Sequence, residues 1–304
     1  MLALLVIAGF TPANDCHAVS NSIIDLSASA HQPGLALVVD KQARKLNVWT
    51  FENNAPKLLF STDVDIGKGS GVKLKRGDLK TPEGVYMLVN KKFPPEVPRE
   101  TYGDLAFTTN YPNYFDRLEG KTGDGIWLHA VPDSVSLNRG SKGCVVVRNN
   151  SILQLDALIR PKHTPIVILD RDEPGNEAER VVSAEKVKAF MESWRSAWQA
   201  QDMAKYLSNY ASKFRGSNMN LSRWKAHKQR LAQMSGTARV EVEGMNILRF
   251  QNEFVVSFSQ KFTSNHFSDE GDKVLYLGYE GKELKIFAED FLRDSVPSAT
   301  ASLK

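Results

Sequence analysis

The residues with the clearest capacity for chemistry are a cysteine and a histidine fifteen positions apart. Cys144 ends the tetrapeptide Ser141-Lys142-Gly143-Cys144, and His129 ends the apolar segment Ile126-Trp127-Leu128-His129. An imidazole can take the proton of a thiol, whose ordinary pKa is near 8.5, and yield a thiolate–imidazolium pair. Gly143 lets the backbone approach a substrate carbonyl, so N–H groups around Gly143 and Cys144 could stabilise an oxyanion. These residue types together predict acyl transfer through a thioester.

The same pair has a purely structural alternative, in which Cys144 is a buried small hydrophobe and His129 a hydrogen-bonded strand-end residue. The other cysteine, Cys16, ends an N-terminal apolar stretch that looks removable, so the mature chain would offer Cys144 no disulfide partner. An unpaired thiol in an exported protein is prone to oxidation, so its retention favours chemical use. Asp124, Asp133 or a backbone carbonyl could orient the imidazole, and the sequence does not choose among them.

The N-terminal segment has the pattern of an export signal. Residues 2–10 form a short apolar core, and Cys16-His17-Ala18 offers a small-residue cleavage site. The core is too short to span a bilayer as a helix. Because no Lys or Arg precedes it, a retained anchor is the alternative to cleavage. We therefore expect residues 1–18 to be a signal segment, the mature protein to be periplasmic, and no integral membrane span elsewhere.

The composition is that of an ordinary globular protein long enough for two domains. The chain has 304 residues, 42% hydrophobic and 24% charged, with a net charge of +4. A charge this small indicates a solvated surface or, alternatively, attraction to a polyanionic cell wall. Basic residues form no stripes and zinc-finger spacing is missing, so no nucleic-acid partner is expected. The glycine-rich stretch 67–71 lacks P-loop spacing and the histidines are scattered, so we expect no cofactor and no metal.

The elements that must position the cysteine and the histidine are mostly strands. Before residue 171, β-branched and aromatic runs predict strands at 35–39, 45–51, 84–89, 125–129, 144–147 and 165–169, with one helix at 151–160. A polar stretch containing Pro and Gly follows at 171–177. Beyond it the chain predicts an α+β domain, with helices at 187–198, 203–210 and 222–233 and strands at 240–242, 254–258 and 274–279. The predicted division is 35–170, a linker at 171–182, and 183–292.

A series of ordered motifs makes the first domain resemble the catalytic domain of YkuD-type L,D-transpeptidases. The motifs, which extend over about residues 35 to 170, are Val38-Val39-Asp40-Lys41, Lys45 to Trp49, Gly67-Lys68-Gly69, Lys75-Arg76-Gly77-Asp78, Thr81 to Tyr86, Asn110-Tyr111-Pro112-Asn113, Asp116-Arg117 and Thr122 to His129. Several of them look like the branch that contains the cell-shape L,D-carboxypeptidases. The resemblance implies a mostly β domain, a YkuD-like β-sandwich with short helices.

The resemblance also implies a reaction. The family attacks the bond between diaminopimelate and D-alanine in peptidoglycan tetrapeptide stems, with Cys144 as nucleophile, His129 as base and Gly143 before the nucleophile. Water as acceptor would trim the stem to a tripeptide, and this L,D-carboxypeptidase outcome is the favoured one. An amine acceptor would instead make the protein an L,D-transpeptidase. A third alternative is a catalytically inactive scaffold that binds the wall.

The substrate-binding residues are less well defined than the nucleophile. The family positions and the nearby cations give Ser141, Lys142, Tyr111, Arg117 and Arg148 as candidates, with Arg139 as a further cation. Three departures affect this assignment: Lys142 replaces a common histidine, Ala130 a glycine, and Val146 the arginine found two positions after the nucleophile in many members.

The second domain resembles the nuclear-transport-factor-like cone found after the catalytic domain in cell-shape L,D-carboxypeptidases. This resemblance rests on Trp194, Trp198, Trp224 and the order of elements over residues 183 to 292. The spacing of Trp194 and Trp198 is typical of the core face of a helix. Such a domain could hold a glycan strand, form a homodimer or bind a cell-wall protein partner.

Overall fold

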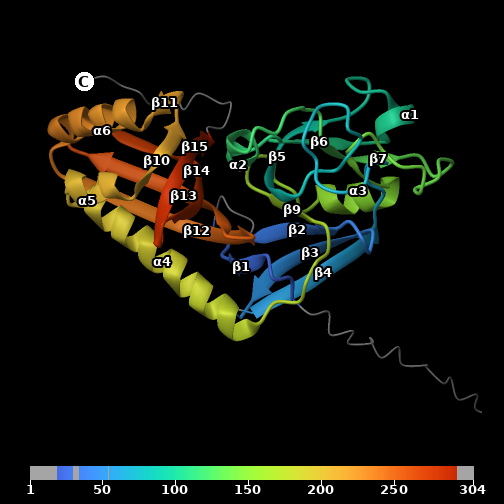
Figure 1. Ribbon diagram of the computed structural model, residues 1–304, viewed down its shortest axis with the longest axis horizontal. Coiled ribbons are helices and arrows are strands. Elements are labelled where there is room, and N and C mark those ends of the chain that lie inside the picture. Colours follow the sequence, from blue (N-terminus) through green and yellow to red (C-terminus); the bar gives the residue numbers. More distant parts are fainter. Residues whose placement is uncertain (1–18, 30–33, 54, 293–304) are drawn as a thin grey trace, which may run out of the picture.

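The structure, a computed structural model, describes residues 19–29, 34–53 and 55–292, which form two lobes (Figure 1). The N-terminal lobe contains the strands β2 (Leu35–Asp40), β3 (Lys45–Glu52), β4 (Ala55–Asp63), β5 (Gly84–Lys92), β6 (Ala106–Thr109), β7 (Trp127–Val131), β8 (Val145–Arg148) and β9 (Pro165–Leu169). Its short helices are α1 (Arg99–Tyr102), α2 (Tyr114–Leu118) and α3 (Asn149–Asp156). The lobe is thus mostly β with short helices, as the sequence predicts.

The strands of the N-terminal lobe form one strongly curled sheet in the order β4-β3-β2-β9-β5-β6-β7-β8. The two ends of the sheet approach each other. Asp65, just after β4, and Val146, within β8, exchange two backbone hydrogen bonds of 2.8 Å. The curl encloses a single apolar core to which α3 also contributes through Ile152 and Leu155. Closure of the sheet brings the chain after β4 directly against the segment that contains Cys144.

The C-terminal lobe is a seven-stranded sheet covered by helices. Its strands are β1 (Ile23–Leu26), β10 (Tyr210–Gly216), β11 (Met219–Asn220), β12 (Ala238–Phe250), β13 (Glu253–Ser264), β14 (Ser268–Glu280) and β15 (Glu283–Leu292), in the order β1-β12-β13-β14-β15-β10-β11. The helices are α4 (Glu177–Gln199), α5 (Met203–Ser208) and α6 (Leu221–Ser235). Strand β1, which the sequence did not predict, pairs with β12, so the N-terminal segment of the described chain completes the C-terminal lobe.

The two faces of the C-terminal sheet have different partners. Alternate residues such as Val256 and Leu275 pack under the helices, whereas Val255 and Tyr276 face the other lobe. That second set joins residues of β2, β5 and β9 in a shared apolar cluster. Asn110 Nδ2 also donates to Tyr276 Oη across the junction at 2.9 Å. The two lobes therefore share a buried interface.

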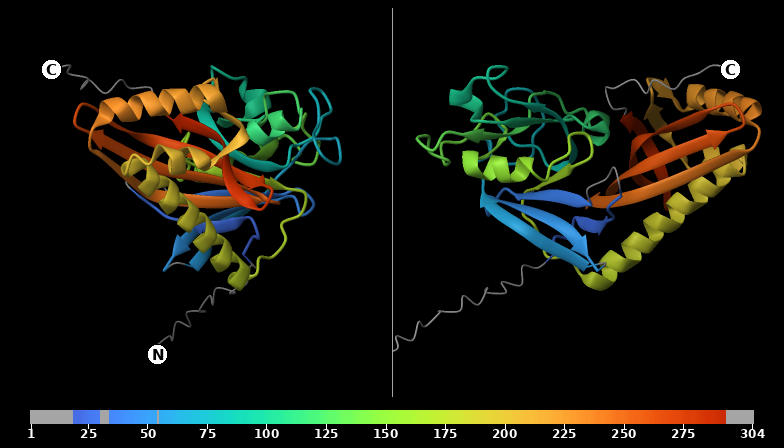
Figure 2. Two further views of the ribbon diagram at one scale, coloured as in Figure 1. Left: turned by 60° about the vertical axis from the view of Figure 1, so that its left-hand side comes forward. Right: turned by 180° about the vertical axis from the view of Figure 1, so that it is seen from behind.

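Helix α4 runs from the junction of the lobes along the C-terminal sheet (Figure 2). Asn176 caps it, because its side chain accepts the N–H groups of Ala178 and Glu179. Residues 177–182, which the sequence assigned to a linker, are thus the first turns of this helix. Trp194 is fully buried in the core, as its spacing predicts.

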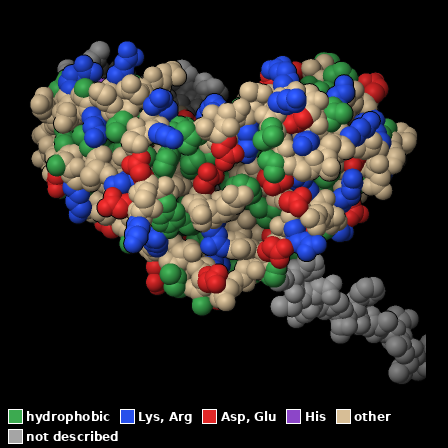
Figure 3. All heavy atoms as spheres, viewed as in Figure 1, with side chains coloured by type: hydrophobic (Ala, Val, Ile, Leu, Met, Phe, Trp, Pro, Cys, Tyr) green, Lys and Arg blue, Asp and Glu red, His purple; other side chains and the backbone are tan. Residues whose placement is uncertain are grey.

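Membrane-spanning helices and the charge of one molecular face can be assessed for residues 19–29, 34–53 and 55–292. In the part of the chain that the structure describes, no helix is both long and apolar enough to cross a membrane. Charged side chains of both signs are interspersed over the face in Figure 3, in keeping with the small net charge. The expected signal segment, residues 1–18, lies outside the described residues.

Candidate active site

The turn that precedes Cys144 is fixed by backbone hydrogen bonds to the chain that follows β4. The Ser141 N–H donates to the Ile66 carbonyl at 2.7 Å, and the Lys68 N–H donates to the Ser141 carbonyl at 3.0 Å. The Ser141 hydroxyl donates to the Cys144 carbonyl at 2.7 Å and accepts the Gly143 N–H at 3.0 Å. Ser141, a candidate for substrate binding, therefore uses its hydroxyl to hold the turn.

Gly143 occupies a position that a side chain would disturb. Its φ is +128°, in the region that favours glycine, and a Cβ atom there would lie 2.7 Å from the Lys80 carbonyl oxygen. Its N–H, expected from the sequence to face an oxyanion, is already engaged by Ser141. The glycine thus lets the Lys80 carbonyl pack directly against the turn at 141–144.

His129 and Cys144 lie on the same face of the sheet. Strands β7 and β8 are parallel, with His129 opposite Val146, and Cys144 stands two positions before Val146. Cys144 immediately precedes β8, and extending the alternation of that strand by one residue puts the thiol on the same side as the imidazole. Tyr102 contacts the His129 ring and its pKa is affected by the charge of Cys144, in agreement with this placement. His129 is buried, with 5% of its surface exposed, whereas Cys144 is half-buried.

The imidazole is oriented by a backbone carbonyl rather than by a carboxylate. His129 Nδ1 lies 2.8 Å from the Ala130 carbonyl oxygen. A carbonyl can only accept, so Nδ1 carries the proton and Nε2 presents a lone pair. Asp124, one of the orienting residues considered from the sequence, instead pairs with Arg76. The neutral ring is therefore in the tautomer that a general base requires.

An aromatic side chain that sequence reasoning missed covers the histidine. Tyr102, at the end of α1, lies edge-on to His129 with ring centroids 5.0 Å apart and contacts Trp127 at 4.8 Å. The charge of Cys144 adds to burial in raising the pKa of Tyr102, so the phenol also lies near the sulfur. The thiol itself donates to the Gly125 carbonyl at 3.4 Å. Tyr102 thus covers one side of the buried imidazole.

Burial disfavours the charged form of both His129 and Cys144. It lowers the pKa of His129 to about 4, and the nearby charge of Arg139 also lowers it, against the opposing effect of the Ala130 carbonyl. Burial raises the pKa of the Cys144 thiol, although the Trp127 N–H and the charge of Lys73 oppose this shift. Both directions favour a neutral thiol beside a neutral imidazole at rest, instead of the thiolate–imidazolium pair expected from the sequence.

These pKa shifts predict how kcat/KM and the alkylation rate of Cys144 depend on pH. A general base must be unprotonated, so kcat/KM is expected to stay level down to about pH 5 and to fall as the pH drops through about 4. Alkylation of Cys144 by iodoacetamide in the free protein should rise steadily with pH above 7, because its pKa is raised. Peptide mass spectrometry of Cys144 measures the rate. A plateau of alkylation extending below pH 6 would contradict the neutral resting pair.

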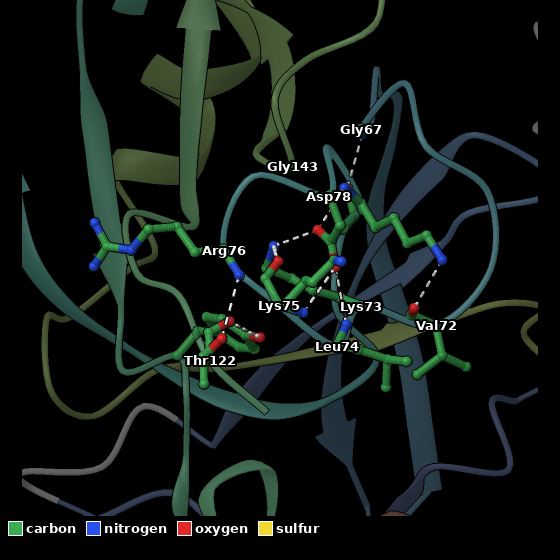
Figure 4. Close-up of polar contacts among 12 residues, drawn as sticks. Gly67, Val72, Lys73, Leu74, Lys75, Arg76, Asp78, Thr122 and Gly143 are labelled. Carbon is green, nitrogen blue, oxygen red and sulfur yellow. Dashed lines mark hydrogen bonds and ion pairs between the residues drawn. The ribbon is translucent and has the colours of Figure 1, made fainter. Parts of the chain in front are cut away.

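A buried ion pair beside the turn at 141–144 is the second feature that sequence reasoning missed (Figure 4). Lys73 Nζ lies 2.7 Å from Asp78 Oδ1, and the two side chains are 3% and 9% exposed. Burial raises the pKa of Asp78, but the bond from Lys73 and the N–H groups of Leu74, Lys75 and Lys80 outweigh it and hold that pKa well below its ordinary range.

The ion pair is connected by packing to the turn that contains Cys144. Asp78 fixes the Lys80 N–H at 3.2 Å, and the Lys80 carbonyl is the group that abuts Gly143. On its other side Lys73 lies over the Tyr111 ring, 5.7 Å from the centroid. The ammonium is thus a fixed positive charge, and its effect on the pKa of Cys144 places it within electrostatic reach of the sulfur.

Two of the other candidates from the sequence are arginines that donate to backbone carbonyls. Arg148 donates to the carbonyls of Pro132, Asp133 and Val135, the bond to Val135 being 2.6 Å. Arg117 donates to the Pro112 carbonyl. Burial raises the pKa values of Tyr114, Tyr276 and Asp290, and the charge of Arg117 opposes each rise, which places it at the junction with the C-terminal lobe. Both guanidinium groups thus donate to backbone carbonyls.

Tyr111, Lys142 and Arg139 have different environments. Tyr111 is buried and its hydroxyl donates to the Thr122 carbonyl at 3.2 Å, so it braces a loop. Lys142 and Arg139 are exposed in the segment that leads to Cys144, and the charge of Arg139 reaches His129. Of the sequence candidates, these two cations are the ones presented to solvent beside the reacting pair.

Comparison with known families matches both lobes. Residues 35–168 match the L,D-transpeptidase catalytic domain (YkuD), and residues 186–290 match the Cds6 C-terminal NTF2-like domain. The fold and the site thus define a two-domain protein with an L,D-transpeptidase catalytic domain and an NTF2-like domain. The chain belongs to the YkuD L,D-transpeptidase family.

Three known proteins are similar to this chain over different shares of its length. Bd1075 of Bdellovibrio bacteriovorus is 37% identical, with a TM-score of 0.78 over 91% of this chain and 99% of Bd1075. The helical cell shape determining protein Pgp2 of Campylobacter jejuni is 26% identical, with a TM-score of 0.66 over 88% of this chain and 95% of Pgp2. The putative L,D-transpeptidase YafK of Escherichia coli is 29% identical over 113 residues, which span 37% of this chain and 42% of YafK.

Proposed function

We propose that this protein is a periplasmic cysteine acyltransferase that cleaves the diaminopimelate–D-alanine bond of peptidoglycan tetrapeptide stems and acts as an L,D-carboxypeptidase. The observation that carries the proposal is the shared face of Cys144 and His129, with Nδ1 of the imidazole bonded to the Ala130 carbonyl. Likeness over nearly the whole chain to Pgp2, a helical cell shape determining protein, supports a substrate in the cell wall.

The geometry supports a two-step reaction. His129 Nε2 takes the thiol proton as Cys144 Sγ attacks the carbonyl carbon of the scissile bond. The tetrahedral intermediate collapses, the C–N bond breaks, and D-alanine leaves with the proton returned by His129. A water molecule, deprotonated by His129, then attacks the thioester, which releases the tripeptide carboxylate and regenerates the thiol. Because the resting pair is neutral, the charge separates only during attack, when Lys73 and the Trp127 N–H stabilise the developing thiolate.

Recognition of the substrate carboxylate falls to the exposed cations beside the pair. Arg139 and Lys142 belong to the segment that leads to Cys144, and both are solvent-accessible. Arg148 and Arg117 are held by backbone carbonyls. A guanidinium binds a carboxylate with two parallel hydrogen bonds, so Arg139 is the stronger candidate.

Product analysis tests the proposal directly. The purified protein is incubated with disaccharide-tetrapeptide, and the products are separated by liquid chromatography with mass detection. Disaccharide-tripeptide and free D-alanine in equal amounts are the expected result. Dimeric muropeptides would instead assign the transpeptidase reaction, in which an amine of a second stem replaces water. Cell fractionation should place the protein in the periplasm, and recovery in the cytoplasmic fraction would refute the assigned location.

The scaffold alternative is separated from both reactions by a reactivity assay. A carbapenem acylates an activated cysteine, so the intact protein should gain the mass of one carbapenem molecule at Cys144. Absence of both turnover and adduct would identify a non-catalytic protein and overturn the proposal.

A further inference from the structure

A buried carboxylate that the proposed reaction does not use lies where the two ends of the N-terminal sheet meet. The Asp65 side chain is 2% exposed, and its backbone exchanges hydrogen bonds with Val146, two positions after Cys144. A buried carboxylate is costly unless donors surround it. Arg44 Nη1 donates to Asp65 Oδ1 at 2.5 Å, and the Ile66 N–H donates to the same oxygen at 3.0 Å. Oδ1 is thus satisfied by nearby groups, whereas Oδ2 serves a different segment of the chain.

That segment is the end of the loop at 132–140, which leads from β7 to the turn at 141–144. The Gly140 N–H donates to Asp65 Oδ2 at 2.7 Å. Gly140 has a φ of +73°, and a Cβ atom there would lie 2.5 Å from Lys68 Cγ, so only glycine suits this close approach. A hydrogen bond to an ionised acceptor is stronger than one between neutral groups. The carboxylate therefore anchors the loop at the end nearest the reacting pair.

The other end of the loop at 132–140 is held by an arginine. Arg148 Nη1 donates to three carbonyls within residues 132–135, the bond to Val135 being 2.6 Å. Among the described residues, the hydrogen bonds that join this loop to the rest of the chain lie at its two ends. The stretch between them is mostly exposed. The position of the loop thus depends on two charged side chains, Arg148 and Asp65.

The loop carries Arg139, the residue directly before Gly140. Arg139 is exposed. Burial lowers the pKa of His129, and the charge of Arg139 lowers it further, so the guanidinium lies within electrostatic reach of the imidazole. Asp65 fixes the backbone from which this side chain extends. A group that is already held in place loses less freedom when it binds a ligand. Asp65 thereby sets the position of Arg139 relative to His129.

We propose that Asp65 is a positioning residue for substrate recognition: by holding Gly140 it places Arg139 to pair with the terminal D-alanine carboxylate of the stem peptide. This role rests on the proposed function, which supplies the ligand. The sign of the effect separates it from simple electrostatics. Loss of a nearby negative charge strengthens the binding of an anion. Loss of the Gly140 anchor weakens that binding instead, because the guanidinium is no longer held in place.

Isothermal titration calorimetry of the full chain carrying Cys144→Ala measures binding without turnover. The two probes are disaccharide-tetrapeptide and its C-terminal amide, which differ only in the D-alanine carboxylate. The acid is expected to bind about tenfold more tightly than the amide, because the amide lacks the charge-assisted bond. Adding Arg139→Met should remove this preference. Adding Asp65→Asn should reduce it to about twofold, because one amide oxygen cannot replace two carboxylate oxygens and the NH₂ group faces a donor.

Arg44→Met is the matched control, because it removes the partner of Oδ1 and leaves the bond from Gly140 to Oδ2. Its preference for the acid should stay within about twofold of the parent value. If Asp65→Asn fails to fold by circular dichroism, Asp65→Asn/Arg44→Met, in which neither charge of the pair remains, takes its place. No saturable binding of the acid, equal parent affinities for acid and amide, an unchanged or stronger preference after Asp65→Asn, or an equal loss after Arg44→Met would each overturn the proposal.

Release of D-alanine by the wild-type protein tests the proposed reaction separately. If no D-alanine is released but the preference for the acid depends on Asp65 as described, the reaction is wrong and the role of Asp65 stands. If D-alanine is released and the preference is insensitive to Asp65→Asn, only the role of Asp65 is wrong.

Discussion

Replacing Cys144 by alanine is expected to abolish the release of D-alanine from disaccharide-tetrapeptide, with kcat/KM lower by on the order of 10⁴-fold or more. The thioester cannot form without the sulfur, and no second thiol lies among the described residues. The substitution removes only one half-buried atom, so the free energy of unfolding should change by about 1 kcal/mol or less. Product analysis by mass spectrometry and urea unfolding measure the two quantities.

The control for this result is chemical. Cys144→Ser keeps a hydroxyl at the same place, but an alcohol is a far weaker nucleophile beside a neutral imidazole, so it should be nearly as inactive as Cys144→Ala. Neither variant should gain mass with a carbapenem. D-alanine release by a folded Cys144→Ala protein at more than about a hundredth of the wild-type rate would show that the thiol is not the nucleophile.

The sequence predicted the strands that lie at the centre of each sheet more successfully than those at the periphery. Runs such as 165–169 are continuously apolar because β9 is covered on both faces, and such runs are conspicuous. Strand β1 has only four residues and pairs with β12, more than 200 positions later in the chain. Strand β4 alternates between exposed and half-buried residues, at the edge of its sheet. Pairings of this kind depend on tertiary contacts that local patterns do not report.

The functional residues divide in a similar way. Cys144 and His129 are proposed as the reacting pair because a thiol and an imidazole stand within an ordered series of motifs, and this assignment stays a prediction. Lys73 and Asp78 lie in a polar, glycine-containing loop, where charges are normally solvated, yet both are buried, and Lys73 lies over the Tyr111 ring. The orienting partner of His129 is a backbone carbonyl, which no side-chain pattern can indicate.

The ion pair beside the nucleophile should have the second-largest effect. Lys73→Met is expected to lower the free energy of unfolding by about 3 kcal/mol, because it leaves the buried Asp78 carboxylate without its counter-ion. It should also slow alkylation of Cys144 at pH 7 by up to about tenfold, since a positive charge that lowers the pKa of the thiol is lost. The pair stabilises the fold at neutral pH, and this contribution disappears as the pH falls below the ordinary carboxyl value of 3.8.

The double variant Lys73→Met/Asp78→Asn separates the two effects. Removing both charges should restore most of the stability, because no unpaired ion remains, but alkylation should stay slow, because the ammonium is still missing. Lys75→Met is the matched control: it removes an exposed charge from the same loop and should resemble wild type in both assays. If the double variant recovers the wild-type alkylation rate together with its stability, Lys73 acts only by holding the loop in place, and its charge does not assist ionisation of Cys144.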